Sequence, residues 1–301
     1  MKVIIPMPIT SSMLTASNVP ETDYAEYSAG TSYAIGNRVI VVVTHKIYES
    51  LIAGNTGNYP PTDVLLTPPH WLEISATNKW KAFDSGVSTQ TSQSESITYQ
   101  ITAGRIFDSL AFINMDAAQI NVVLTDPSFG EVYNQTVSLM TTTVIDWYSY
   151  FFSGIVVQTT DYVFSNLPPY LDAVLDITIT YQGSTAKAGV IVLGFETYIG
   201  KTQYMPSIGI KDYSVKDVDD FGNATFIPGA YSKKMTCDVN IPYDMVDQIV
   251  KLLSMYTATP IVYIGTELYS SMIIYGKFND FSVVIPHLTF SECSIEIEGL
   301  I

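Results

Sequence analysis

The sequence of 301 residues is poor in charge, and poorest in positive charge. Asp, Glu, Lys and Arg make up only 14% of it, against about 25% in an average soluble domain. Ser, Thr, Asn and Tyr must then cover much of the surface, a composition that suits contacts between chains. With 14 Lys and Arg against 29 Asp and Glu, the formal net charge is −15. Nucleic-acid binding depends on Lys and Arg contacts that release counterions from phosphates, so no nucleic-acid partner is expected.

Metal-ligating side chains are also scarce. Two cysteines, Cys237 and Cys293, are too few for a disulfide framework, and neither they nor the three histidines have the spacing of a metal site. Each cysteine lies in a pattern of alternating apolar residues, which predicts a buried, reduced thiol. No metal and no cofactor is expected.

Long apolar runs are missing. No run of about 18 apolar residues is present, so the sequence predicts no transmembrane helix and no membrane partner. The first nine residues carry one lysine and are broken by Pro6, unlike a secretion signal. Because Pro6 and Pro8 also prevent a helix, we expect an extended N-terminal arm over residues 1–23.

The common catalytic motifs are absent as well. The sequence contains no Gly-x-Ser-x-Gly elbow, no glycine-rich phosphate loop and no His-Glu-x-x-His helix. The acidic stretch with Asp217, Asp219 and Asp220 lacks the Glu that closes a calcium loop, and a solvated turn explains it better. We therefore expect no catalytic residue and no enzyme activity.

What the sequence does contain is alternation. Apolar and polar residues alternate with a period of two in many segments, such as 96–101, 119–124 and 172–181, and turn residues separate these segments. Such runs predict antiparallel strands. One segment has helical spacing instead, with Pro242 in its first turn and Lys251 toward its end. The expected fold is mainly β, with one helix at about 242–255.

Composition divides the chain into five parts. After this N-terminal arm, 24–84 is a small, turn-rich β module. Residues 85–96, rich in Ser and Thr, are expected to be a linker, although an exposed edge also fits their composition. A β-sandwich of the jelly-roll or galactose-binding-like kind is expected over 97–200. Strands and the single helix then form an α+β domain over 201–301.

Tyrosine is abundant, with 21 residues. In the small module the prominent rings are Tyr27, Tyr33, Tyr48 and Trp71, and aliphatic residues are few. These rings can form the core of the module, or a flat platform on which sugars or a partner's side chains stack. Both interpretations stay open, and the four residues are our candidate glycan or partner platform.

Within the module, Ala34-Ile35-Gly36-Asn37-Arg38-Val39 is followed by Tyr48-Glu49-Ser50 and closed by Trp71. This pattern resembles the small chitin-binding modules of carbohydrate-binding families 5 and 12. It departs from them at Asn37, where the family has Asp, and at Tyr27, where it has a leading Trp. Residues 68–84 are similar to the end of this module in tailed-bacteriophage virion proteins, in which a β-sandwich follows.

The C-terminal part resembles the tail-tube-like domain of phage tail proteins. The resemblance rests on a strand, the helix at 242–255, a further strand, the segment 275–285 and a last strand that ends near Leu300. In that family two sheets and one helix assemble edge to edge into rings. Long alternating strands with open edges would favour such pairing, although a self-contained domain with covered edges fits the sequence equally.

The two resemblances imply a structural component of a tailed-phage virion, in the tail, baseplate or neck. Such a protein is made in the host cytoplasm and resides in the virion. Its expected partners are copies of itself in a ring and the neighbouring tail, neck or fibre proteins that it attaches. The alternative is an adhesin that binds host surface polysaccharide through the aromatic module. A lesser alternative is a glycan-cleaving enzyme, because a catalytic carboxylate pair has no fixed spacing along a sequence.

Overall fold

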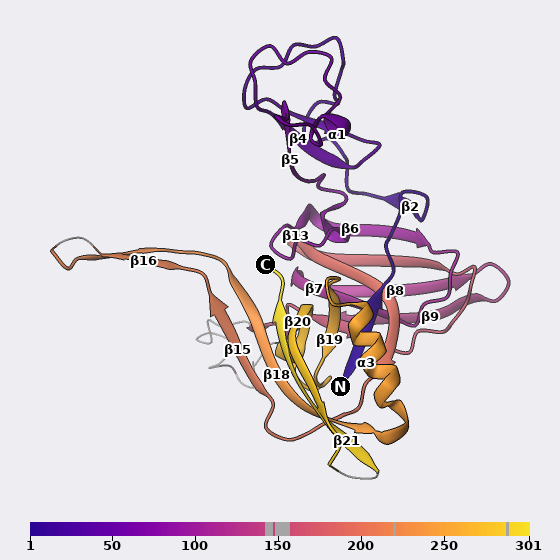
Figure 1. Ribbon diagram of the computed structural model, residues 1–301. Helices are drawn as coiled ribbons and strands as arrows, with labels where there is room; N and C mark the ends of the chain where they lie inside the picture. Colours follow the sequence, from indigo (N-terminus) through magenta and orange to yellow (C-terminus); the bar gives the residue numbers. More distant parts are fainter. Residues whose placement is uncertain (142–146, 148–156, 219–220, 287–288) are drawn as a thin grey trace.

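The computed structural model describes residues 1–141, 147, 157–218, 221–286 and 289–301 (Figure 1). It consists mainly of antiparallel strands, which confirms the expected fold class. Most strands join one large sheet, while the N-terminal module lies at one end of the molecule with a three-stranded sheet of its own (Figure 1).

The strands of the large sheet are β1 (Lys2–Pro6), β2 (Leu14–Ser17), β6 (Thr91–Thr102), β7 (Ser109–Asp116), β8 (Gln119–Asp126), β9 (Gly130–Ser138), β12 (Tyr162–Phe164), β13 (Val174–Tyr198), β14 (Lys201–Thr202), β15 (Ser207–Asp212), β18 (Tyr231–Pro242), β19 (Ile261–Ile264), β20 (Ile273–Val284) and β21 (Phe290–Gly299). The other strands are β3 (Arg38–Val41), β4 (Lys46–Ser50) and β5 (Trp71–Ala76) of the module, and the pairs β10 (Met140–Thr141) with β11 (Val157–Gln158) and β16 (Val215–Val218) with β17 (Ala224–Ile227). The helical elements are α1 (Pro60–Asp63), α3 (Val246–Met255) and the 3-10 turns Lys81–Phe83, Tyr243–Met245 and Ser270–Met272.

The helix expected at about 242–255 is present. A 3-10 turn over Tyr243–Met245 leads into α3, which lies against the C-terminal part of the sheet (Figure 1). Ile249 and Leu253, one helical turn apart, are its buried residues and pack into the cluster that contains Val3 and Val239. The sequence did not predict the four-residue α1 in the module.

β13 connects the two halves of the protein. Over 174–180 it lies between β6 and β8, and after a register shift between Thr180 and Thr185 it pairs with β7 over 187–194. Its last residues pair with β1. One strand of 25 residues therefore runs from the central sandwich into the C-terminal part of the sheet. The core of the sandwich is apolar and fully buried, and includes Phe112 and Leu124.

The N-terminal segment is extended, as expected, but it does not stand free of the sheet. β1 is an interior strand that pairs with β13 on one side and β19 on the other. Val3 and Ile4 are both fully buried, in clusters on opposite faces of the sheet. Pro6, which has no N–H to donate, lies at the end of the strand. Both hydrogen-bonding partners of β1 therefore lie in its own chain.

The segment 85–96, expected to be a linker, contains the first half of β6. Thr91 to Ser94 pair with Ala188 to Thr185 of β13, and Thr91 is fully buried, with its hydroxyl donating to the carbonyl of Asn78 at 2.7 Å. β-Branched threonine suits a strand. The polar composition of this segment suggested a linker. Composition does not show whether a distant strand, here β13, pairs with the segment.

The two cysteines are free and buried, which confirms that expectation. Burial raises the pKa of both thiols, Cys237 and Cys293, to about 11. Protonated thiols of this kind are poor nucleophiles, so both residues act as small core side chains. In the part of the chain that the structure describes, no helix is long and apolar enough to cross a bilayer.

Candidate functional site

A two-stranded ribbon projects far from the body of the protein (Figure 1). It begins with β15 paired to the start of β18 and continues outward as β16 paired to β17; we call residues 207–231 the arm. Every side chain of β15, β16 and β17 is exposed. A two-stranded ribbon without further packing is marginally stable in water, so the arm has the properties of an element that another surface covers.

Apolar side chains occur on both faces of the arm. The register places Val215 opposite Ile227, and Lys216 opposite Phe226. Since opposite residues share a face and successive residues alternate, Val215 and Ile227 lie on one face and Phe226 with Val218 on the other. The Lys216 ammonium lies 5.9 Å from the centre of the Phe226 ring. Each face of the arm therefore presents apolar side chains beside polar ones, with Asp217 and Thr225 on the first face and Lys216 on the second.

The apolar surface of the arm is large for an unassembled protein. Eight of its apolar side chains are 41–70% exposed: Ile208, Ile210, Tyr213, Val215, Val218, Phe226, Ile227 and Tyr231. Because an aromatic side chain alone can bury about 150–250 Å², the total is on the order of several hundred Å². That is comparable with the roughly 800 Å² that each partner buries in a stable interface, and monomers seldom expose patches of this size.

Glu298 on β21 fixes the root of the arm to the sheet. Its carboxylate accepts hydrogen bonds of 2.8 Å from the Lys211 ammonium, the Tyr213 hydroxyl and the Asn279 amide. The hydrogen bond from Lys211, followed by those from Asn279 and Tyr213, lowers the pKa of Glu298 to about 2. This ion pair therefore persists at any ordinary pH.

We expect Glu298→Gln to loosen the arm at its root. The unperturbed pKa of this carboxyl is 4.5 and the folded value is about 2, so the anchor is fully present above pH 4.5 and is lost as the pH falls toward 2. Hydrogen exchange of residues 207–214 measures this. Protection in the wild type should hold down to about pH 4.5 and then decline, while the variant should be less protected above pH 4.5, with a difference that shrinks as the pH falls toward 2. Equal protection in the two proteins at neutral pH would contradict the role of Glu298.

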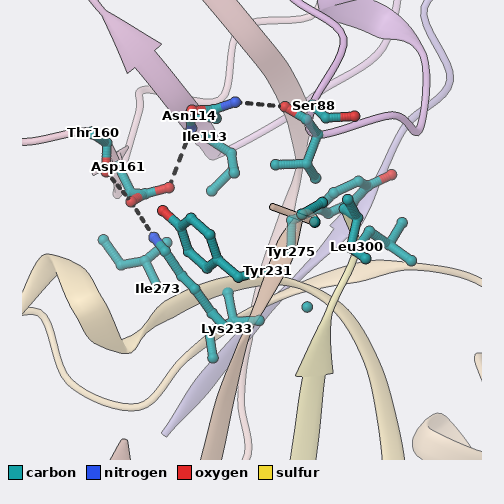
Figure 2. Close-up of a pocket in the computed structure, with 16 residues that line it drawn as sticks. Ser88, Ile113, Asn114, Thr160, Asp161, Tyr231, Lys233, Ile273, Tyr275 and Leu300 are labelled. Carbon is teal, nitrogen blue, oxygen red and sulfur yellow. Dashed lines mark hydrogen bonds and ion pairs between the residues drawn. The ribbon is translucent and has the colours of Figure 1, made fainter. Parts of the chain in front are cut away.

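A cavity of about 340 Å³ lies where the sandwich, the C-terminal strands and the root of the arm meet (Figure 2). At its polar end Asp161, 2% exposed, accepts a hydrogen bond from the Asn114 N–H at 3.2 Å and one from the Thr160 hydroxyl at 2.6 Å. It also pairs with Lys233 of β18. At the other end lie apolar and aromatic groups such as Tyr275 and Leu300 (Figure 2).

The Asp161–Lys233 pair joins the arm-bearing strand β18 to the sandwich. Asp161 is the one side-chain carboxylate among the described residues around this cavity, and Lys233 already neutralises it. Glycan hydrolysis needs two carboxyl groups that flank the scissile bond, so this cavity offers no basis for it. Among the described residues no group of three or more His, Cys, Asp and Glu side chains is placed to hold a metal.

The four candidate platform residues come together in the module, but as its core. Tyr33, Tyr48 and Trp71 are 8%, 2% and 1% exposed, and Tyr27 is half-buried against them. The ring of Trp71 meets those of Tyr33 and Tyr27 edge-on, with centroids 5.2 and 6.0 Å apart. The platform expectation is corrected for Tyr48 and Trp71: with so few aliphatic residues the rings fill the module, and burial leaves these two no face for a ligand. Tyr33 is part of the same core but also lines a groove on the outside of the module.

The groove on the outer surface of the module is lined in part by side chains that are accessible to a ligand. Tyr24, 39% exposed, lines it together with Arg38 and Glu49. Arg38 Nε donates to Glu49 at 2.7 Å, and its Nη1 donates to the Tyr24 hydroxyl at 3.3 Å. An accessible ring beside a fixed ion pair can stack a flat ligand and form hydrogen bonds to its hydroxyl groups.

No protein-family model matches the chain, and no curated protein matches it. Among solved structures, part of the chain is similar to the lectin domain of lectinolysin complexed with Lewis B antigen. The match covers 38% of this chain and 82% of that chain, at 11% identity and a TM-score of 0.26. A similarity of this size carries no conclusion about what the present chain binds.

The sequence interpretation missed the arm and the groove. Alternation predicts strands, but it does not tell a projecting ribbon from a core strand. The one available signal was apolar residues at both odd and even positions of the arm, Val215 and Val218 on β16 and Phe226 and Ile227 on β17. Tyr24 stands three residues before Tyr27 in the same tyrosine-rich segment, but the candidate platform did not include it.

Proposed function

We propose that this protein is a structural subunit that assembles with copies of itself into a ring, in the tail, baseplate or neck of a tailed-phage virion. The observation that carries the proposal is the arm, which exposes apolar side chains on both faces, on the order of several hundred Å² in total. A second copy of this chain could cover the arm without any other protein. The resemblances of the module and of the C-terminal part to phage proteins support the virion as its location.

The shape of the arm favours a ring over a two-fold dimer. The arm projects outward from one side of the sheet (Figure 1), so a neighbour that covers it uses a surface other than its own arm. Contacts between two different surfaces repeat from copy to copy and close into a ring when the rotation permits. The neighbouring tail, neck and fibre proteins would attach to the surfaces that the ring leaves free, including the outlying module.

Light scattering and electron microscopy of the purified chain test this proposal. Each copy has a formal charge of −15, so the measurement belongs at about 0.15 M salt, where repulsion is screened beyond roughly 8 Å. We expect ring-shaped oligomers, and copies of the chain in purified virions. A protein that stays monomeric at high concentration and is absent from virions would refute the proposal.

Glycan binding by the module is a second candidate function, and the groove at Tyr24, Arg38 and Glu49 favours it. Weak single sites would suffice on a ring, since many copies bind one surface together. Calorimetric titration with chitin oligosaccharides or host surface polysaccharide is the measurement. Absence of heat with the wild type would remove this candidate.

We expect Tyr24→Ala to weaken glycan binding without unfolding the module. Because one stacked ring contributes roughly 0.5–1.5 kcal/mol, the affinity should fall about 2- to 12-fold. Tyr204→Ala is the matched control, since Tyr204 is 98% exposed and lies outside the module. Equal loss of affinity in both variants would assign the binding to another surface.

A further inference from the structure

Three side chains from separate segments form a hydrogen-bonded chain where the module meets the body. Ser11 Oγ lies 2.7 Å from His45 Nε2, and His45 Nδ1 lies 2.8 Å from Glu21 Oε1. Ser11 is in the turn after β1, Glu21 follows β2, and His45 is in the turn between β3 and β4. Hydroxyl, imidazole and carboxylate in this order are the arrangement that activates a serine as a nucleophile.

The surroundings hold the imidazole in place. Its ring stacks on Trp80, with centroids 4.1 Å apart and an interplanar angle of 21°. Glu21 Oε1 also accepts a hydrogen bond of 2.8 Å from the Thr77 hydroxyl, which orients the carboxylate. With that carboxylate at Nδ1, the neutral ring carries its proton on Nδ1 and presents the lone pair of Nε2 to Ser11. The serine itself is exposed.

We propose that Ser11 is a catalytic nucleophile for the hydrolysis of short-chain carboxylic esters, with His45 as its general base and Glu21 as a positioning residue. Ser11 Oγ attacks the ester carbonyl carbon as its proton moves to His45 Nε2. The same proton passes to the departing alcohol, which leaves an acyl-serine. A water molecule then attacks the acyl carbon and gives its proton to His45, and Ser11 takes that proton as the carboxylic acid leaves.

The exposed position of Ser11 defines the class of ester. Ser11 is exposed and lines neither the cavity at Asp161 nor the groove at Tyr24, so the proposed substrate is one that needs no enclosing acyl pocket. The substrate is an acetyl-sized ester that stands out from its carrier. Ser12, the next residue, has a backbone N–H that donates to no acceptor among the described residues, and such an N–H is a suitable donor to the oxyanion that forms on the carbonyl.

Two measurements on the intact wild-type chain test the nucleophile. A fluorophosphonate probe should label Ser11, as located by mass spectrometry of the peptides, and p-nitrophenyl acetate should be hydrolysed with turnover. Ser11→Ala should abolish both signals. Ser128→Ala is the control, because Ser128 is also an exposed serine but lies in the turn between β8 and β9, outside the proposed site, and it should leave the labelling at Ser11 intact. Labelling that is absent, or hydrolysis that is equal in Ser11→Ala and wild type, would overturn the proposal.

Two further variants separate catalysis from a structural role. His45→Gln keeps a polar side chain but cannot act as a base, and should lower kcat by about 10²- to 10⁴-fold. Glu21→Gln should lower kcat with KM unchanged, since Glu21 does not touch the substrate. If the three side chains only hold the module in place, these variants will alter thermal stability and leave labelling and hydrolysis unchanged, which would overturn the proposal. Ring assembly of Ser11→Ala should equal that of the wild type. A negative result for ester hydrolysis therefore leaves the proposed subunit role untouched, and a negative result for assembly leaves the proposed hydrolysis untouched.

Discussion

Replacing Phe226 and Ile227 by aspartate is expected to convert the assembled protein into folded monomers. The two residues lie on opposite faces of the arm and are 70% and 54% exposed in the single chain. Burying one such side chain contributes about 1.5–3 kcal/mol, so the association constant should fall by about 10²- to 10⁴-fold. Size-exclusion chromatography with light scattering measures the change, and circular dichroism should show unchanged β structure.

The matched control adds the same charge away from the arm. Val43 and Leu65 lie in loops of the module and are each 82% exposed, so Val43→Asp with Leu65→Asp should leave the oligomer intact. If the control dissociates as completely as the arm variant, added charge and not loss of the arm contact is responsible. Oligomers that persist in the arm variant would remove the arm as the carrier of assembly.

Trp71→Ala is expected to unfold the N-terminal module while the rest of the protein stays folded. Trp71 is 1% exposed, and its indole Nε1 donates to the carbonyl of Asn58 at 2.9 Å. Its backbone N–H donates to the buried carboxylate of Asp63, also at 2.9 Å. Removing the ring should cost about 3–5 kcal/mol, which approaches the entire stability of a small unit. Hydrogen exchange of residues 24–84 against the rest of the chain is the measurement.

Leu72→Ala is the control for that experiment. Leu72 is the next residue of β5 and is 48% exposed, on the other face of the strand. Its replacement should change stability by no more than about 0.5 kcal/mol. If Trp71→Ala behaves in the same way and instead loses a ligand, the ring is a binding platform after all and the assignment to the core is wrong.

The helix and most of the strands could be predicted, because each has a hydrophobic pattern within one short stretch of sequence. The helix at 242–255 follows from apolar residues at helical spacing, and most strands follow from alternation. The position of β1 does not, because a pattern such as Val3-Ile4-Ile5 suits a free strand and a central one equally. Its neighbours, β13 and β19, lie about 190 and 260 residues further along the chain.

The candidate sites were less predictable than the fold, for a related reason. Tyr33, Tyr48 and Trp71 are recognisable as a set, but whether rings point inward depends on how few other apolar residues the module has to bury. The strands of the arm differ from core strands because no other described element of the chain packs on their faces. The local sequence does not reveal that difference. Ser11, Glu21 and His45 meet only because three separate segments converge.

The place of β1 between β13 and β19 also shapes how the chain is made. The ribosome makes β1 about 260 residues before Ile261–Ile264, so β1 cannot complete its hydrogen bonding until that strand has followed it. At about 5–20 residues per second, the ribosome needs roughly 13–52 seconds to supply that partner. Until then, the edge of β1 that will pair with β19 stays open to wrong pairings, even after β13 has been made. The nascent protein should therefore depend on chaperones, and a message truncated before codon 261 should yield aggregates.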